Sequence, residues 1–239
     1  MTEVLDGMAV LPPVNIEESC PICGKTAHDF PEKKPVDIDT IKSKPRSLGC
    51  GHLNPREQRG KYGRARHHMI PVHQCYTKVV RLAQMAESVG YNINGKQNGI
   101  PLPTVWNKYE ADGQKKNFGE LNDDQKNEIR NSAMRMTGGQ WHVGHHHYDL
   151  PEKEDATEDM EDEGELDHVP YDMEVIKQLT RLAKKILNAD LCEAEDQSKV
   201  KDRLDNLCKD IESKLNAFKA NPKSSKPFYV SKWAMIFEA

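Results

Sequence analysis

A run of acidic residues in the second half of this 239-residue chain most constrains how the chain can fold. Residues 149–168 contain eleven Asp and Glu side chains and a single Lys, which gives this stretch a charge of −10. It has too few apolar side chains to anchor itself to a core, so we expect a linker or mobile loop. The acidic stretch therefore separates the region before it from the region after it.

The rest of the sequence limits the cellular setting. No apolar run approaches the roughly 20 residues that a membrane helix needs, so we expect no membrane insertion. The first residues, MTEVLDGM, lack the basic and then apolar layout of a secretory signal peptide. The sequence therefore predicts a protein made in the cytoplasm, and any export would use a route without a cleaved leader.

Charge outside the acidic stretch is positive. The net charge of the chain is −4, so the other 219 residues together carry +6. Lys and Arg side chains gather just before an adjacent histidine pair, and among them Arg64 and Arg66 are our candidates for phosphate contacts. Cationic groups beside a metal site suit a polyanionic nucleic-acid backbone. The alternative interpretation is an ordinary solvated basic loop.

Periodicity predicts a helix-rich α+β protein. Apolar spacing predicts a helix over residues 72–89 that ends at Gly90, and residues 91–102 suit a hairpin or an irregular strand. A polar insertion follows over residues 104–140, with one helix near Asp123–Met136. Two amphipathic stripes beyond the acidic stretch predict a helical hairpin joined around Asp190–Asp196, and the apolar segment Phe228–Phe237 should dock on the body. The apolar stripes comprise Ile176, Leu179, Ala183, Ile186 and Leu187, and then Val200, Leu204, Leu207, Ile211, Leu215 and Phe218.

Cysteine spacing predicts a structural zinc site near the N-terminus. Cys20 and Cys23 form a CxxC pair, and Cys50 and His52 follow, which together offer three thiolates and one imidazole for a tetrahedral zinc ion. His28 is an alternative fourth ligand. The remaining cysteines, at positions 75, 192 and 208, have no ligand-like spacing, so we expect buried helix positions for them.

Histidines recur at two distant places in the sequence. His67 and His68 are adjacent, whereas His142 and His146 are four residues apart, a spacing that puts two imidazoles on one face of a helix. Three of these imidazoles, from His67, His142 and His146, would hold one metal ion with positions left open for water and phosphate. His68 projects differently and would act as a general base, since the ordinary pKa of histidine is about 6.5. Phosphodiester hydrolysis needs this combination of groups.

Four blocks of sequence then carry a family resemblance. The runs RHHMIP, GYNIN, NGIPLP and HVGHH, which begin at residues 66, 90, 98 and 142, resemble the AHH branch of the HNH/endonuclease VII superfamily of ββα-metal nucleases. That branch is common among bacterial polymorphic toxins and secretion-system effectors. The resemblance covers about residues 64–148. Arg66 stands where the family has alanine, and the gap between Pro103 and His142 is longer than is usual, which predicts an extra wall on the substrate cleft.

The resemblance implies a role for each matching residue. It makes His67 a metal ligand and His68 the general base that activates water, while Asn98 would orient the base and its strand. The helix of the ββα finger would supply His142 and His146 as the remaining ligands, and His142 with His145 is an alternative pair. The predicted domains are an N-terminal arm with a Cys3His zinc module (1–55), a nuclease core (56–150), an acidic linker (151–170) and a C-terminal helical region (171–239).

The sequence thus predicts a metal-dependent, non-specific DNA endonuclease of the antibacterial toxin type. Its expected cofactors are one catalytic divalent ion (Mg²⁺, Mn²⁺, Ni²⁺ or Zn²⁺) and one structural Zn²⁺. Its expected partners are DNA, a cognate immunity protein and a secretion-system component, because such a toxin is delivered by a specialised system into target bacterial cells. The alternatives are a zinc-stabilised nucleic-acid-binding module, which would leave DNA intact, and a housekeeping HNH endonuclease of restriction or phage type.

Overall fold

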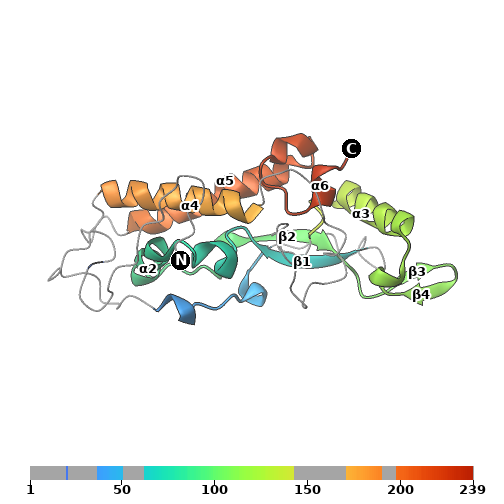
Figure 1. The fold of residues 1–239 in the computed structure, drawn as a ribbon, viewed down its shortest axis with the longest axis horizontal. Helices are drawn as coiled ribbons and strands as arrows, with labels where there is room; N and C mark the ends of the chain where they lie inside the picture. Colours follow the sequence, from blue (N-terminus) through green and yellow to red (C-terminus); the bar gives the residue numbers. More distant parts are fainter. Residues whose placement is uncertain (1–19, 21–36, 51–61, 143–170, 190–197, 239) are drawn as a thin grey trace, which may run out of the picture. The chain divides into compact units, whose positions relative to one another are not determined.

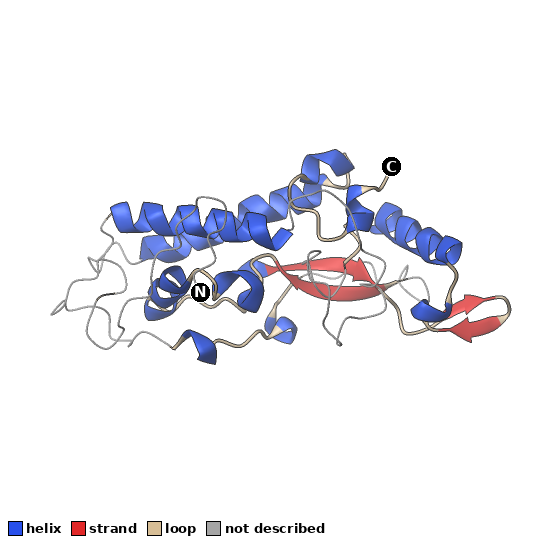
Figure 2. Ribbon diagram, viewed as in Figure 1, coloured by secondary structure: helices blue, strands red, loops and turns tan. Residues whose placement is uncertain are grey.

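The computed structural model describes residues 20, 37–50, 62–142, 171–189 and 198–238. These residues form a mixed α+β structure rich in helix, which confirms the predicted class (Figures 1 and 2). They divide into two compact units, each built from segments that are distant in the sequence. The first unit combines Met1–Leu48, His68–Asn98 and Asp172–Lys209, and the second combines Gly49–His67, Gly99–Tyr171 and Asp210–Ala239. Among the helices of the described ranges, none is long and apolar enough to span a bilayer.

The first unit is helical. Its short elements are η1 (Ile38–Thr40), η2 (Pro45–Ser47), the π-helical turn η3 (Val72–Tyr76) and η4 (Lys96–Asn98), and its longer helix from the middle of the chain is α2 (Val80–Ser88). All but the first residue of α4 (Tyr171–Asn188) also belongs to it, as does the first part of α5 (Ser198–Ala217). The single helix predicted over residues 72–89 is therefore two elements, and Gly90, with a φ of 71°, follows the second one as expected.

The predicted apolar stripes are the buried faces of α4 and α5. In α4, Leu179, Ala183 and Ile186 are completely buried, and in α5 the same holds for Val200 and Leu204. Leu187 and Leu207, at the edges of their stripes, are only half-buried. The segment predicted to join the two helices, Asp190–Asp196, lies outside the described residues, as does the acidic linker.

The second unit contains the strands of the described residues, except for His68 at the end of β1. Strands β1 (Gly63–His68) and β2 (Gly99–Thr104) form one two-stranded sheet, and β3 (Tyr109–Ala111) pairs antiparallel with β4 (Gln114–Lys116) in the other. The elements that follow are η5 (Phe118–Glu120), α3 (Asp123–Thr137), η7 (Pro222–Ser225) and α6 (Lys232–Met235). Helix α3 confirms the helix predicted near Asp123–Met136. The segment predicted to dock at the end of the chain does so, because Phe228, Tyr229 and Val230 are buried.

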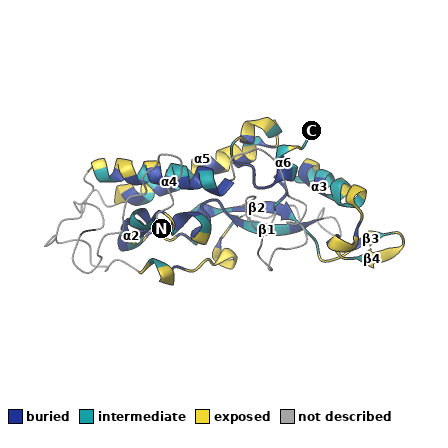
Figure 3. Cartoon of the chain, in the orientation of Figure 1, coloured by how far each residue is buried: buried dark blue, intermediate teal, exposed yellow. Residues whose placement is uncertain are grey.

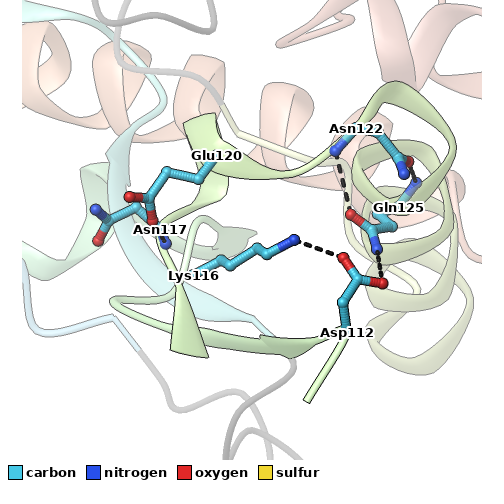
Figure 4. Close-up of polar contacts among 6 residues, drawn as sticks. All are labelled: Asp112, Lys116, Asn117, Glu120, Asn122 and Gln125. Atoms are coloured by element: carbon cyan, nitrogen blue, oxygen red, sulfur yellow. Dashed lines mark hydrogen bonds and ion pairs between the residues drawn. The ribbon is translucent and has the colours of Figure 1, made fainter. Parts of the chain in front are cut away.

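The insertion at residues 104–140 is held together by short polar contacts (Figure 4). The side chain of Asn122 accepts a hydrogen bond from the N–H of Gln125 at 2.9 Å, and the side-chain oxygen of Gln125 accepts one from the N–H of Asn122 at 3.1 Å. The two bonds form a capping box at the start of α3. Lys116 pairs with Asp112 at 2.5 Å across the β3–β4 turn. The Gln125 amide also donates to Asp112 at 3.5 Å, so it links the hairpin to α3.

Much of the hairpin and of η5 is exposed (Figure 3). Beside the hairpin lies a cavity of about 760 Å³, which Trp106 and Tyr109 line together with two lysines and two glutamates among other residues. Because its charged lining is balanced, this cavity gives no specific sign of a phosphate site. The idea that the insertion forms a wall of a substrate cleft stays a prediction.

Candidate functional site

The second unit brings His67 and His142 together. His67, in β1, is 3% exposed, and the centroid of its ring lies 5.1 Å from that of His142 with an angle of 67° between the ring planes. The ring of Tyr171, the first residue of α4, lies 5.2 Å from that of His67 at 71°. Three rings that are far apart in the sequence therefore meet in one cluster, and two of them are predicted metal ligands.

Backbone contacts with β2 fix the position of His142. Its N–H donates to the carbonyl oxygen of Pro103 at 2.8 Å, and its own carbonyl accepts from the Thr104 hydroxyl at 2.9 Å. The preceding Trp141 is completely buried. The expectation that His142 lies on a helix is wrong, because α3 ends at Thr137 and His142 has no regular secondary structure. The partner predicted for it, His146, lies outside the described residues.

The spacing of the two imidazoles suits a shared metal ion. Zinc binds histidine nitrogen at about 2.0–2.1 Å, which puts the ring centroids of two ligands in a tetrahedral site about 5 Å apart. The 5.1 Å between His67 and His142 agrees with this value. Within the part of the chain that the structure describes, no group of three His, Cys, Asp or Glu residues forms a metal site. The described residues therefore do not form a metal site by themselves, and His146 as a third ligand stays a prediction.

His68, the predicted base, contacts an asparagine that sequence reasoning missed. The His68 side chain is in the first unit and only 7% of the residue is exposed. Its Nε2 lies 3.1 Å from Oδ1 of Asn94. Burial lowers the pKa of His68 below the ordinary 6.5, the nearby His73 lowers it further, and the Asn94 hydrogen bond opposes both effects. His68 is therefore neutral at pH 7, which is the form that can accept a proton.

Asn98 holds the chain just beyond His68. Its side chain is completely buried and accepts the N–H of Ile70 at 2.7 Å, while its amide nitrogen donates to the carbonyls of Ile70 at 3.0 Å and Ile93 at 2.9 Å. The thiol of Cys208 also donates to Asn98 Oδ1, at 3.6 Å. These contacts suit the predicted role of Asn98 in orienting the strand that carries the base, although the side chain that contacts the His68 imidazole is that of Asn94.

The other predicted residues are placed only in part. Arg64 and Arg66 are half-buried in β1, and their contact with phosphate stays a prediction. Cys20 is buried and Cys50 half-buried, whereas Cys23 and His52 lie outside the described residues, so the zinc module also stays a prediction. Cys75 and Cys208 are completely buried in η3 and α5, which confirms their predicted helix positions.

Sequence reasoning missed Asn94 and Tyr171 for different reasons. Asn94 is part of the GYNIN block, so its sequence signal was present, but the role of orienting the base was assigned to Asn98 alone. Tyr171 follows the acidic stretch directly, and nothing in the local pattern links it to His67. Comparison of the chain with models of known protein families, with curated proteins and with solved structures gave no match.

Proposed function

We propose that this chain is a metal-dependent, non-specific DNA endonuclease. The observation that supports the proposal best is the approach of His67 and His142 to 5.1 Å between ring centroids, a separation that is compatible with two ligands of one metal ion. His68 follows His67 directly in β1 and is buried and neutral. The residue types and their order along the chain are those of the AHH resemblance.

Each side chain has a defined task in this proposal. His67 and His142 hold the divalent ion, with His146 as the predicted third ligand. The ion, when bound, supplies a Lewis acid for the scissile phosphate and for the leaving oxygen. His68 takes a proton from the attacking water, and Asn98 keeps the backbone after the base in place through its bonds to Ile70. Only the phosphate backbone is contacted, so cleavage is independent of sequence.

The resemblance extends the proposal to biology. An antibacterial toxin of this type acts in a target bacterial cell, requires a cognate immunity protein in the producing cell and travels by a specialised secretion system. We also propose that Cys20, Cys23, Cys50 and His52 hold one structural Zn²⁺. Elemental analysis of the purified protein should then find one zinc ion that Cys50→Ser loses, and a parent protein without zinc would remove this part of the proposal.

Plasmid cleavage in the presence of Mg²⁺, Mn²⁺, Ni²⁺ or Zn²⁺ tests the proposed activity. General base catalysis contributes about 10²- to 10⁴-fold, so we expect His68→Ala to lower kcat by that factor with little change in DNA binding. His67→Ala and His142→Ala should lower metal affinity as well. The matched control is His73→Ala, because His73 is an exposed histidine only five residues from the base.

Two outcomes would reject the endonuclease. The first is a folded parent protein that binds DNA with every metal and leaves the strands intact, which would favour the zinc-stabilised binding module. The second is a His68→Ala variant that cleaves as fast as His73→Ala. For the predicted third ligand, we expect His146→Ala to lower the affinity for the metal ion.

A further inference from the structure

Asn94 connects the predicted base with a distant part of the chain inside the first unit. Its Oδ1 lies 3.1 Å from Nε2 of His68 and also accepts the backbone N–H of Lys44 at 2.7 Å. Its amide nitrogen donates to the carbonyl oxygen of Lys42 at 2.9 Å. One side chain therefore contacts the imidazole on one side and the backbone of residues 42–44 on the other.

These contacts determine which way the Asn94 amide points. If the amide were turned over, its NH₂ group would face the N–H of Lys44, and its oxygen would face the carbonyl of Lys42. The first arrangement opposes two donors and the second opposes two acceptors, so both hydrogen bonds would be lost. The oxygen of Asn94 is therefore the atom that faces His68.

The orientation of Asn94 in turn fixes the tautomer of His68. An amide oxygen has no proton to give, so Nε2 of His68 must carry the hydrogen in the 3.1 Å contact. In a neutral imidazole the other nitrogen is then an acceptor. Nδ1 is thus the nitrogen of His68 that is left as a hydrogen-bond acceptor.

The backbone that holds Asn94 is itself anchored. Residues 42–44 lie between η1 and η2, and the buried side chains of Ile41 and Leu48 flank them. This segment lies between Cys20 and Cys50 in the sequence, so the N-terminal arm helps to position the predicted base through Asn94.

We propose that Asn94 is the residue that positions the predicted base. Asn94 selects the Nε2–H tautomer of His68 and links its imidazole to the backbone of residues 42–44. The proposal rests on the proposed function in one respect, which is the role of His68 as the base. The tautomer itself does not depend on any activity.

The first measurement is the tautomer of His68 by long-range ¹H–¹⁵N correlation NMR in the full chain. We expect the hydrogen on Nε2 in the parent protein, a mixture of tautomers in Asn94→Leu and the parent tautomer in Asn94→Asp, which keeps an acceptor in the same place. The control is Asn107→Leu, which alters an exposed asparagine in the second unit. A parent protein with the hydrogen on Nδ1 would overturn the proposal.

The second measurement is plasmid cleavage by the same variants. Asn94→Leu should lower kcat on the order of 10- to 100-fold, with the KM for DNA unchanged, and Asn94→Asp should restore most of the loss. A parental tautomer and parental kcat in Asn94→Leu would reject the role of Asn94. If Asn94→Leu does not fold, the tautomer of His68 in the parent protein and in Asn94→Asp tests the proposal. A parent protein with the expected tautomer and no cleavage with any metal would reject the endonuclease alone.

Discussion

Replacement of Asn98 by alanine gives the sharpest test of how the first unit is held together. The change removes three hydrogen bonds to backbone groups, namely the N–H of Ile70 and the carbonyls of Ile70 and Ile93. A buried polar group that loses its partner costs about 1–3 kcal/mol, so we expect Asn98→Ala to lower the free energy of unfolding by about 3 to 5 kcal/mol. For a chain of this length, such a loss corresponds to a fall in Tm on the order of 10 °C.

Urea unfolding followed by far-UV circular dichroism measures this loss. Amide hydrogen exchange gives a local readout, because the N–H of Ile70 should exchange faster once its acceptor is gone. Asn98→Asp should be destabilised as well, since it keeps the acceptor for Ile70 but loses both donors and buries a charge. The control Asn107→Ala, at an exposed position, should stay within about 0.5 kcal/mol of the parent. A loss below about 1 kcal/mol in Asn98→Ala would refute the argument from buried hydrogen bonds.

Three further predictions concern other parts of the fold. Burial and the nearby Asp172 raise the pKa of Cys75 well above its ordinary 9.0, so iodoacetamide at pH 8 should label this thiol only after unfolding. Peptide mass spectrometry measures the labelling, and equal labelling of the folded and unfolded protein would contradict this prediction. Gly138 has a φ of 67°, and a Cβ there would lie 2.6 Å from Cγ of Lys219. Gly138→Ala should therefore lower the free energy of unfolding in urea by about 1–2 kcal/mol. A variant as stable as the parent would argue against strain at this turn. Lys116 lowers the pKa of the exposed Asp112, so the contribution of this pair is complete above the ordinary carboxyl pKa of 3.8 and is lost as pH falls through the lowered value. The difference in Tm between Asp112→Asn and the parent should therefore shrink on acidification, and a difference that is constant with pH would exclude the pair as its source.

Local patterns in the sequence predicted much of the secondary structure. The stripe that includes Leu179 and Ile186 predicted the buried face of α4, because burial of one face imposes a period of 3.6 residues on a helix. Gly90, which was predicted to end a helix, follows α2 with a positive φ value, as a left-handed residue after a helix requires. Such features depend on neighbours within one or two turns of the chain, and so the sequence reveals them directly.

The site shows where local patterns are insufficient. His67 and His142 were placed together by a family resemblance and not by any periodicity. The same reasoning put His142 on a helix, whereas its backbone bonds to Pro103 and Thr104 hold it beside β2. The contact between His68 and Asn94 joins residues 26 positions apart through a single hydrogen bond. No repeating pattern records such a contact, because it depends on how the end of β1 and a loop meet after the chain has folded.

The ring cluster around His67 also bears on how such a sequence can change over time. His142 and Tyr171 both touch this imidazole, so the intervening polypeptide leaves from one neighbour of His67 and returns to the other. The entropy of closing a chain grows only with the logarithm of its length, by about 0.6 kcal/mol for each doubling. A change in the number of residues between these two anchor points should therefore cost the fold little. The proposed site sets a narrower limit than the fold, because the predicted third ligand, His146, lies in the same stretch of sequence.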